Sequence, residues 1–409
     1  MINNLRTKFY EYPRQFWLLA VAVLIDAMGG WLIFPFFALY LTQKLNVTLV
    51  QVGLIYFIWA LTGLVGNTVG GALADRGGRK KMVVSGLVLS AVTSLIIVLA
   101  PTYFWQLITA AIGGFFSRIG QPAWHAMIAD TLPEEQYSDG FGIVRIVDNV
   151  AAMIGPAIGG LLASVSFILL FSVDILSSTL AAIFVARNLR ESMSNTSAEK
   201  TSEQSVGSIF RGYLIALKDF KLIAVTILTV LIGLAHFQLY FALPVFLRDA
   251  HSFAPKVYGG LMSLAGGMVI LFQFSLTRKL KRFSLVSQLA LGSFLFSIGF
   301  SFIGFINAIP SFVIVIMLIT IAGMIYFPVQ QSLPALIAPE EMRGRYIAVG
   351  MQALSLPPLL GPGLAGLLMD NTSPNLLWFL AGILCLVGTL GYMALGTRFD
   401  KTSETISTA

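Results

Sequence analysis

The chain has 409 residues, of which 57% are hydrophobic and only 11% are charged, and its net charge is +7. An average soluble domain carries about 25% charged residues, so this composition excludes a water-soluble globular protein and places the chain in a lipid bilayer. The single cysteine, Cys385, excludes an intrachain disulfide and a thiolate metal site, and we expect it to be a buried structural thiol.

Twelve long apolar runs follow one another along the chain. A membrane-spanning helix needs about 20 mostly apolar residues. The runs that meet this length cover residues 15–42, 48–74, 82–101, 104–129, 141–164, 166–188, 221–247, 256–277, 284–308, 310–337, 346–369 and 375–397. Their unbroken length favours helices over the short alternating strands of a β-barrel, so the sequence predicts an all-α membrane protein.

The first run follows three cations, Arg6, Lys8 and Arg14, as the apolar part of a signal peptide would. It continues past Asp26 to Leu41 without a cleavage site of small residues, so we expect an uncleaved first span.

Most of the 26 Lys and Arg residues lie in segments on the same side of the membrane as the N-terminus. Cytoplasmic loops carry an excess of these residues, so both termini are predicted to be cytoplasmic, in a cell (plasma or inner) membrane. Contact with the lipid bilayer, whose inner leaflet is anionic, accounts for the positive net charge, and we expect no nucleic-acid partner.

The chain repeats itself at a shift of 206 residues, which aligns Pro122 with Pro328 and Gly155-Pro156 with Gly361-Pro362. The one long polar stretch separates the sixth and seventh runs. We therefore predict an N-terminal six-helix half at 1–190, a cytoplasmic linker at 191–220 and a C-terminal six-helix half at 221–409. Helical spacing of apolar residues in the linker indicates an amphipathic helix on the membrane surface, or a cytoplasmic start to the seventh span.

Between the second and third runs the chain reads Gly71-Ala72-Leu73-Ala74-Asp75-Arg76-Gly77-Gly78-Arg79-Lys80. The glycines permit a tight turn, and the charged residues can pair with neighbouring helix ends. This loop resembles the signature of the major facilitator superfamily, which it matches at every defined position. The resemblance implies the fold of that superfamily, with two pseudo-symmetric six-helix bundles.

In that superfamily the loop latches the two halves on the cytoplasmic side. The resemblance implies that Asp75 meets the start of the eleventh span and that Arg79 meets the acid at the end of the fourth. The residues of this predicted conformational latch are Gly71, Asp75, Arg76, Gly78, Arg79, Asp130, Arg343 and Arg345. The corresponding loop of the second half has cations but neither the acid nor the glycines, so one such latch is expected.

The fifth span carries a Gly-Pro-x-x-Gly-Gly sequence that resembles the core of a signature associated with antiporters of this superfamily. Proline bends a helix and small residues allow close helix packing, so the segment is predicted to bend, although helix packing alone would also explain it. The eleventh span repeats the pattern. The predicted helix-bending residues are Gly155, Pro156, Gly159, Gly160, Gly361 and Pro362.

Charged side chains inside spans cost about 2.5 to 3.5 kcal/mol each and are functional candidates by default. The predicted proton-coupling residues are Asp26, Arg118, Arg145, Asp148 and Asp174. Arg118 and Gln121 resemble the R-x-x-Q signature of the superfamily's fourth span, although Pro122 stands where glycine is usual. The resemblance associates Arg118 with proton transfer and places Asp26 at a similar depth.

We therefore predict that Asp26 pairs with Arg118 and exchanges its proton when substrate weakens the pair. A permanent structural ion pair is the alternative. Arg145 and Asp148 are three residues apart on one helix face, where a local pair is expected. Asp174 is either a second titratable site or a buried structural acid.

Aromatic and amide residues are expected to line a large, mostly apolar substrate pocket. They are Trp31, Phe34, Gln121, Trp124, His236, Gln238, Tyr240, Tyr326, Phe327 and Gln330. Such a wall suits amphiphilic or aromatic compounds better than sugars.

The sequence as a whole predicts a secondary transporter, most like the proton-coupled drug efflux branch, that exports small amphiphilic compounds in exchange for protons. Its expected partners are a small-molecule substrate and protons, and it is expected to work as a monomer. A nutrient symporter or facilitator and a lipid flippase of the same fold are alternatives. A membrane enzyme is disfavoured because no nucleophile with a base and no metal-ligand set is visible, and neither a cofactor nor a metal is expected.

Overall fold

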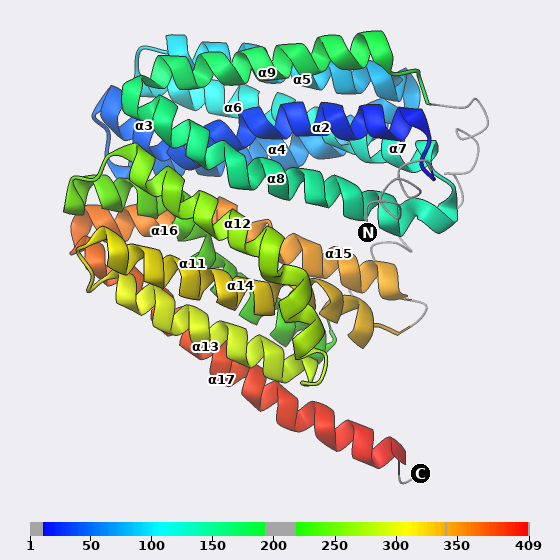
Figure 1. Cartoon of the computed structure of the whole chain (residues 1–409), viewed down its shortest axis with the longest axis vertical. Coiled ribbons are helices and arrows are strands. Elements are labelled where there is room, and N and C mark those ends of the chain that lie inside the picture. Colours follow the sequence, from blue (N-terminus) through cyan, green and yellow to red (C-terminus); the bar gives the residue numbers. More distant parts are fainter. Residues whose placement is uncertain (1–10, 193–217, 340–341, 408–409) are drawn as a thin grey trace. The chain divides into compact units, whose positions relative to one another are not determined.

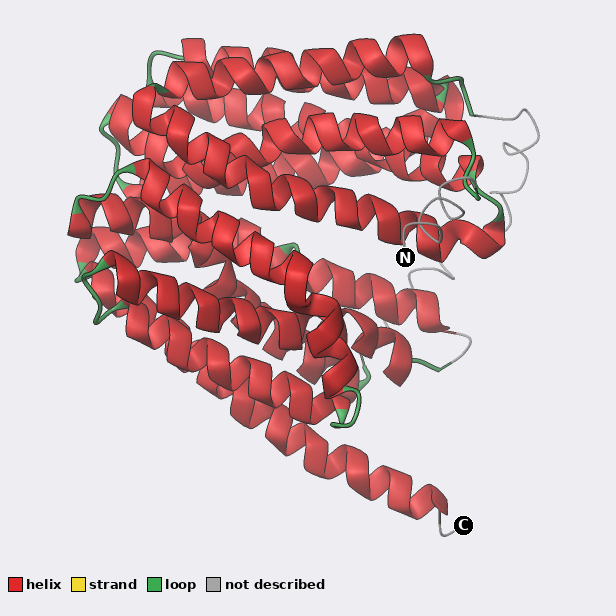
Figure 2. Cartoon of the chain, in the orientation of Figure 1, coloured by secondary structure: helices red, strands yellow, loops and turns green. Residues whose placement is uncertain are grey.

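The computed structural model describes residues 11–192, 218–339 and 342–407 (Figure 1). Every regular element in these ranges is a helix (Figure 2). The predicted linker, with its amphipathic helix, falls mostly at 193–217 and lies outside the described residues.

The helices of the first half of the sequence follow the predicted runs closely. They are α2 (Arg14–Ile33), η1 (Phe34–Phe36), α3 (Phe37–Leu45), α4 (Leu49–Gly77), α5 (Arg79–Leu99), α6 (Tyr103–Ile119), α7 (Gln121–Thr131), η2 (Glu134–Gln136), α8 (Tyr137–Val165) and α9 (Phe167–Asn188).

The second half continues with seven helices in the described ranges. They are α11 (Phe220–His251), α12 (Pro255–Leu280), α13 (Leu285–Ile303), α14 (Ile309–Ile337), α15 (Arg343–Ala353), α16 (Leu356–Asn371) and α17 (Pro374–Ser407).

Eleven helices of the described chain are long and apolar enough to cross a membrane, against twelve predicted runs. The difference lies in the fourth run, which the structure divides at Gly120 into α6, of 17 residues, and α7, of 11. Proline lacks a backbone N–H and is tolerated at the start of a helix, and Pro122 stands in the first turn of α7. Each piece alone is shorter than a span.

The helices form two compact units. Unit 1 comprises Met1–Val47, Leu54–Ser202 and Ala254–Gly266, and unit 2 comprises Thr48–Gly53, Glu203–Phe253 and Gly267–Ala409. Each unit therefore includes the start of one helix from the other half of the sequence, α12 in unit 1 and α4 in unit 2. The sequence did not lead us to expect this exchange.

Within unit 1, α2 packs against α8 and α9, and α5 packs along α9 (Figure 1). The core between them is apolar, with Phe16, Val83 and Val185 fully buried. Glycines set the closest approaches: a Cβ atom on Gly155 of α8 would lie 2.6 Å from Cβ of Trp31 on α2. Small residues at helix crossings provide van der Waals packing where lipid supplies no hydrophobic drive.

Within unit 2, α13 packs against α14 and α17, while α11 packs against α16 and α17. Large aromatic side chains fill this core, among them Phe296, Phe300 and Trp378. The hydroxyl groups of Tyr326 and Tyr392 are 3.0 Å apart and share a hydrogen bond between α14 and α17. Pairing of buried polar groups is required where no water reaches them.

The 206-residue repeat is also visible in the structure. Equivalent side chains at the ends of α8 and α16 make similar hydrogen bonds. In unit 1, Ser164 Oγ accepts a hydrogen bond of 3.1 Å from the backbone N–H of Lys256, at the start of α12. In unit 2, the Asp370 carboxylate accepts bonds of 3.1 and 2.7 Å from Leu49 N–H and Val50 N–H, at the start of α4. Ser164 and Asp370 are repeat equivalents, and both cap a helix N-terminus.

Candidate functional site

Two carboxyl groups lie close together inside unit 1. Asp26 on α2 interacts electrostatically with Asp174 on α9, and Ser178 lies within hydrogen-bond reach of Asp26. Ser94 on α5 donates a hydrogen bond of 2.6 Å to Asp174 Oδ2. Asp174 is only 5% exposed. Three helices thus bring together two acids and two hydroxyl groups.

Gly29 allows the two acids to approach. It lies one turn after Asp26 on α2, and a Cβ atom there would lie 2.2 Å from Ser177 Oγ and 2.6 Å from Asp174 Oδ1. Any larger side chain would force the side chains of Ser177 and Asp174 to move. The carboxylate pair therefore depends on a glycine at this position.

The predicted contact of Asp26 with Arg118 is wrong. Arg118 Nη1 instead donates a hydrogen bond of 3.0 Å to Gln121 Oε1, across the break at Gly120. The stem of Arg118 passes over Gly63 of α4, where a Cβ atom would lie 3.1 Å from Arg118 Cγ. The R-x-x-Q residues therefore contact each other, and Asp26 faces α9 rather than α6.

The expected pair of Arg145 and Asp148 is also absent from the described part of the chain. Trp31 Nε1 on α2 donates a hydrogen bond of 3.2 Å to Asp148 Oδ1 on α8. Helical spacing places Arg145 and Asp148 on one face of α8. The hydrogen-bond donor to Asp148 is nevertheless the Trp31 indole of α2. Phe34 packs edge-on against the same Trp31, with 5.9 Å between ring centroids.

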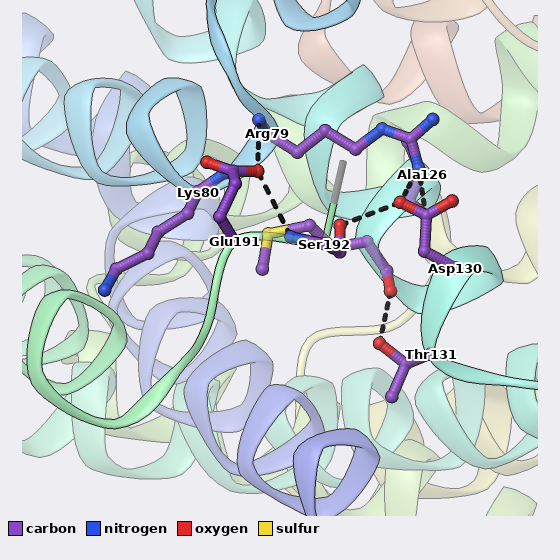
Figure 3. A network of polar contacts seen from close by, with 8 residues as sticks. Arg79, Lys80, Ala126, Asp130, Thr131, Glu191 and Ser192 are labelled. Atoms are coloured by element: carbon purple, nitrogen blue, oxygen red, sulfur yellow. Dashed lines mark hydrogen bonds and ion pairs between the residues drawn. The ribbon is translucent and has the colours of Figure 1, made fainter. Parts of the chain in front are cut away.

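A polar network surrounds the start of α5 (Figure 3). Arg79 forms an ion pair with Asp130 at the end of α7 and donates a hydrogen bond of 3.1 Å to Ala126 O. Ser192 Oγ donates a bond of 2.7 Å to Asp130 Oδ2. The contact of Arg79 with Asp130 is the one that the loop signature implied.

Glu191 is also part of this network, and the sequence analysis did not predict its role. Its Oε1 accepts hydrogen bonds of 2.8 and 3.2 Å from the backbone N–H groups of Arg79 and Lys80, at the N-terminus of α5. Gly78 has φ of +92°, and a Cβ atom there would lie 2.8 Å from Glu191 Oε2. The sequence placed Glu191 in the polar linker, where an N-capping acid gives no recognisable pattern.

Three other residues of the predicted latch, Asp75, Arg76 and Arg343, have side chains that lie outside the described part of the structure. Arg345 is described, and it forms no ion pair with a described acid. A Cβ atom on Gly71 would lie 3.9 Å from Pro122 Cβ, so the packing around this glycine leaves room for a small side chain.

The predicted helix-bending segments serve as packing surfaces. Pro156 lies inside α8 and Pro362 inside α16, and both helices continue through the proline. A Cβ atom on Gly159 would lie 2.5 Å from Leu32 O, and one on Gly160 would lie 3.1 Å from Cα of Gly259 on α12. These glycines let α8 approach α2 on one side and the start of α12 on the other.

In unit 2, His236 lies among aromatic rings. Its imidazole is 4.8 Å from the ring of Phe327, 5.7 Å from Phe296 and 5.8 Å from Tyr240, each measured between centroids. Tyr326 on α14 points instead toward α17, where it bonds Tyr392. Trp124 of α7 packs at the edge of the apolar core of unit 1.

Two amide groups in unit 2 have an unsatisfied oxygen. Gln238 Nε2 donates to Leu234 O and Gly361 O at 3.0 and 3.2 Å. Gln238 Oε1 and Gln330 Oε1, on residues 4% and 2% exposed, have no hydrogen-bond partner among the described residues. Buried polar atoms are seldom left unpaired in proteins, so these oxygens are available to a bound donor.

The chain is similar in sequence to one protein family and to several known relatives. The model of the family described as Major Facilitator Superfamily matches residues 19–356 and 287–407. A relative named Na(+), Li(+), K(+)/H(+) antiporter, from Planococcus maritimus, is 26% identical over 81% of this chain and 84% of its own length. The Multidrug resistance protein MdtH of Shigella sonnei is 22% identical over 95% of each chain.

Solved structures agree on the fold. A POT family transporter in complex with 5-aminolevulinic acid has a TM-score of 0.77, with 14% identity, and the match covers 94% of this chain and 96% of that one. The nucleoside transporter NupG has a TM-score of 0.75 and 13% identity, over 93% and 99% of the two chains.

Proposed function

Because the chain belongs to the major facilitator superfamily and is a membrane transporter rather than an enzyme, we propose that it exports small amphiphilic compounds in exchange for protons. The proposal includes twelve spans, with α6 and α7 together forming the fourth, cytoplasmic termini and a working monomer. The observation that carries it is the interaction of Asp26 with the buried Asp174 in unit 1.

The carboxylate pair suits proton coupling because no described cation lies with it. Two interacting negative charges within membrane-spanning helices are costly, so a proton on either Asp26 or Asp174 relieves their repulsion. The hydroxyl groups of Ser94 and Ser178 can form a hydrogen bond with a carboxyl group whether it is protonated or ionised, because a hydroxyl both donates and accepts. Loss and gain of that proton would accompany each transport cycle.

Unit 2 supplies the features that suit an amphiphilic substrate. The rings around His236 offer apolar contact, and the unpaired amide oxygens of Gln238 and Gln330 would accept hydrogen bonds from an amine or hydroxyl group. A compound with an aromatic body and one or two donors fits this chemistry. The multidrug resistance relatives support the same substrate class.

Exchange of Na⁺ or a similar cation for protons is a second candidate. The groups around Asp26 and Asp174 are all oxygen donors, which hard cations prefer. The name of the Planococcus maritimus relative points in this direction. A monovalent cation would then compete with the proton for the carboxylate pair.

Proteoliposomes containing a pH-sensitive dye would separate these candidates. We expect cationic amphiphiles to drive proton movement across the membrane of vesicles with wild-type protein, and Asp26→Asn to abolish it. Asp139→Asn, which removes an exposed acid from the first turn of α8, is the matched control and should behave as wild type. Proton movement driven by NaCl or LiCl but by no amphiphile would favour the second candidate, and no response to either would reject both.

A further inference from the structure

Unit 2 contains a cleft that the transport mechanism does not use. Its volume is about 740 Å³, within the range of small-molecule sites, and α13, α14 and α17 form its walls. Its lining includes Ser284, Ser287, Phe294, Leu336, Thr389 and Met393. The wall is apolar apart from the hydroxyl groups, and Phe294, Leu336 and Met393 are 45%, 59% and 57% exposed.

The cleft lies at one end of the membrane-crossing helices. It includes the first residues of α13, the last turns of α14 and the stretch of α17 from Thr389 to Gly396. Exposed apolar side chains on such helices are covered by lipid in a bilayer. The cleft therefore opens near the level where hydrocarbon meets head groups.

The same end of unit 2 carries a cluster of cations. Arg278 and Lys279 end α12, and Lys281 and Arg282 follow in the turn before α13. All four are exposed, and none forms an ion pair with a described acid. Ser284, which caps α13, follows directly and lines the cleft.

We propose that the cleft binds an anionic phospholipid of the inner leaflet. An acyl chain would occupy the space between α14 and α17, and the phosphate would lie against Lys281, Arg282 and the N-terminal turn of α13. Basic sites between transmembrane helices on the cytoplasmic side bind anionic head groups, and a helix N-terminus adds a favourable dipole. The proposal rests on the predicted cytoplasmic position of the α12–α13 turn and not on the exported substrate.

Native mass spectrometry of the full-length protein tests this site. Protein would be released from nanodiscs that contain equal amounts of phosphatidylglycerol and phosphatidylcholine with identical chains. We expect wild type to retain one phosphatidylglycerol. Lys281→Ala with Arg282→Ala should weaken its binding on the order of tenfold to thirtyfold, because each cation near the surface contributes to anionic lipid binding. Leu336→Trp, which fills the cleft, should reduce retention as well.

Two matched controls keep the test specific. Arg187→Ala with Arg190→Ala removes two exposed cations at the end of α9, and Leu271→Trp enlarges a side chain that is 70% exposed on α12. Both should retain the lipid. Equal retention of the two lipids, retention by both cleft variants, or a bound amphiphile or second protein copy in place of lipid would overturn the proposal. Loss of lipid in the charge variant, with an unchanged melting temperature, would support it even if Leu336→Trp failed to fold.

Discussion

Gly29 determines how closely the two acids of unit 1 approach each other. It lies on α2, one turn after Asp26, and it faces Asp174 and Ser177 of α9. A change there would act on the proton site without touching either carboxyl group. Gly30, its neighbour, has open space around it.

We therefore expect Gly29→Ala to destabilise the protein by about 1 to 3 kcal/mol, as overpacking of a close contact does. Proton-coupled transport should fall as well, because Asp174 must move. Gly30→Ala should leave stability unchanged or slightly higher. Thermal unfolding in detergent, together with vesicle transport, measures both effects, and equal behaviour of the two variants would contradict this role for Gly29.

Glu191 is the second residue whose role is local and testable. Replacing it with Ala removes the acceptor for two N–H groups at the start of α5, and losing such a cap costs about 0.5 to 2 kcal/mol. Hydrogen exchange in the first turn of α5 should become severalfold faster. Glu191→Gln should have a smaller effect because an acceptor remains.

Glu135→Ala removes an exposed acid from η2 and serves as the control for this prediction. Its exchange pattern in α5 should equal that of wild type. Unchanged exchange in Glu191→Ala would show that water satisfies these N–H groups equally well.

Sequence reasoning predicted some contacts of the ionisable residues and missed others. Arg79 and Asp130 were found together because a loop signature fixes their relation. Asp26 was assigned to the wrong neighbour because its helix is apolar on every side, so periodicity does not reveal which face points to α9. The role of Glu191 was missed because it caps α5, a helix more than 100 residues earlier in the chain, and the sequence does not show that the two segments meet.

At the scale of helices, the crossings of α8 with α12 and of α16 with α4 are repeat equivalents. Gly160 meets Gly259 in unit 1, while Gly366 meets the backbone of Leu49 and Val50 in unit 2. Each crossing, with its cap at Ser164 or Asp370, joins helices from opposite halves of the sequence.

Gly366→Ala tests the importance of such a crossing. Its Cβ atom would lie 2.5 Å from Val50 N and 2.6 Å from Leu49 C, and backbone atoms cannot rotate away. We expect a loss of about 1 to 3 kcal/mol in stability and slower transport. Gly363→Ala, on the same helix, meets nothing within 4 Å and is the control. Transport and melting temperatures that are equal in the two variants would contradict the close crossing.

The helix boundaries themselves were largely predictable. Long apolar runs gave the spans, and the one substantial difference, the break of the fourth run into α6 and α7, occurs at the Gly120-Gln121-Pro122 sequence. A proline inside an apolar run can bend, break or simply continue a helix, as Pro156 does in α8, and neighbouring contacts decide which.

For the molecule as a whole, the repeat provides two similar units that carry different chemistry. The interacting acids, Asp26 and Asp174, lie in unit 1, whereas the aromatic rings around His236 and the unpaired amide oxygens lie in unit 2. The proposed function thus assigns proton coupling and substrate contact to different units.

We propose that Asp26 and Asp174 hold the proton that is exchanged for substrate. Substrate counterflow, measured beside transport driven by a pH gradient in the same proteoliposomes, tests it most directly. We expect Asp26→Asn and Asp174→Asn each to abolish gradient-driven accumulation while counterflow continues, because exchange of substrate for substrate needs no proton. Gradient-driven accumulation at the wild-type level in both variants would contradict the account.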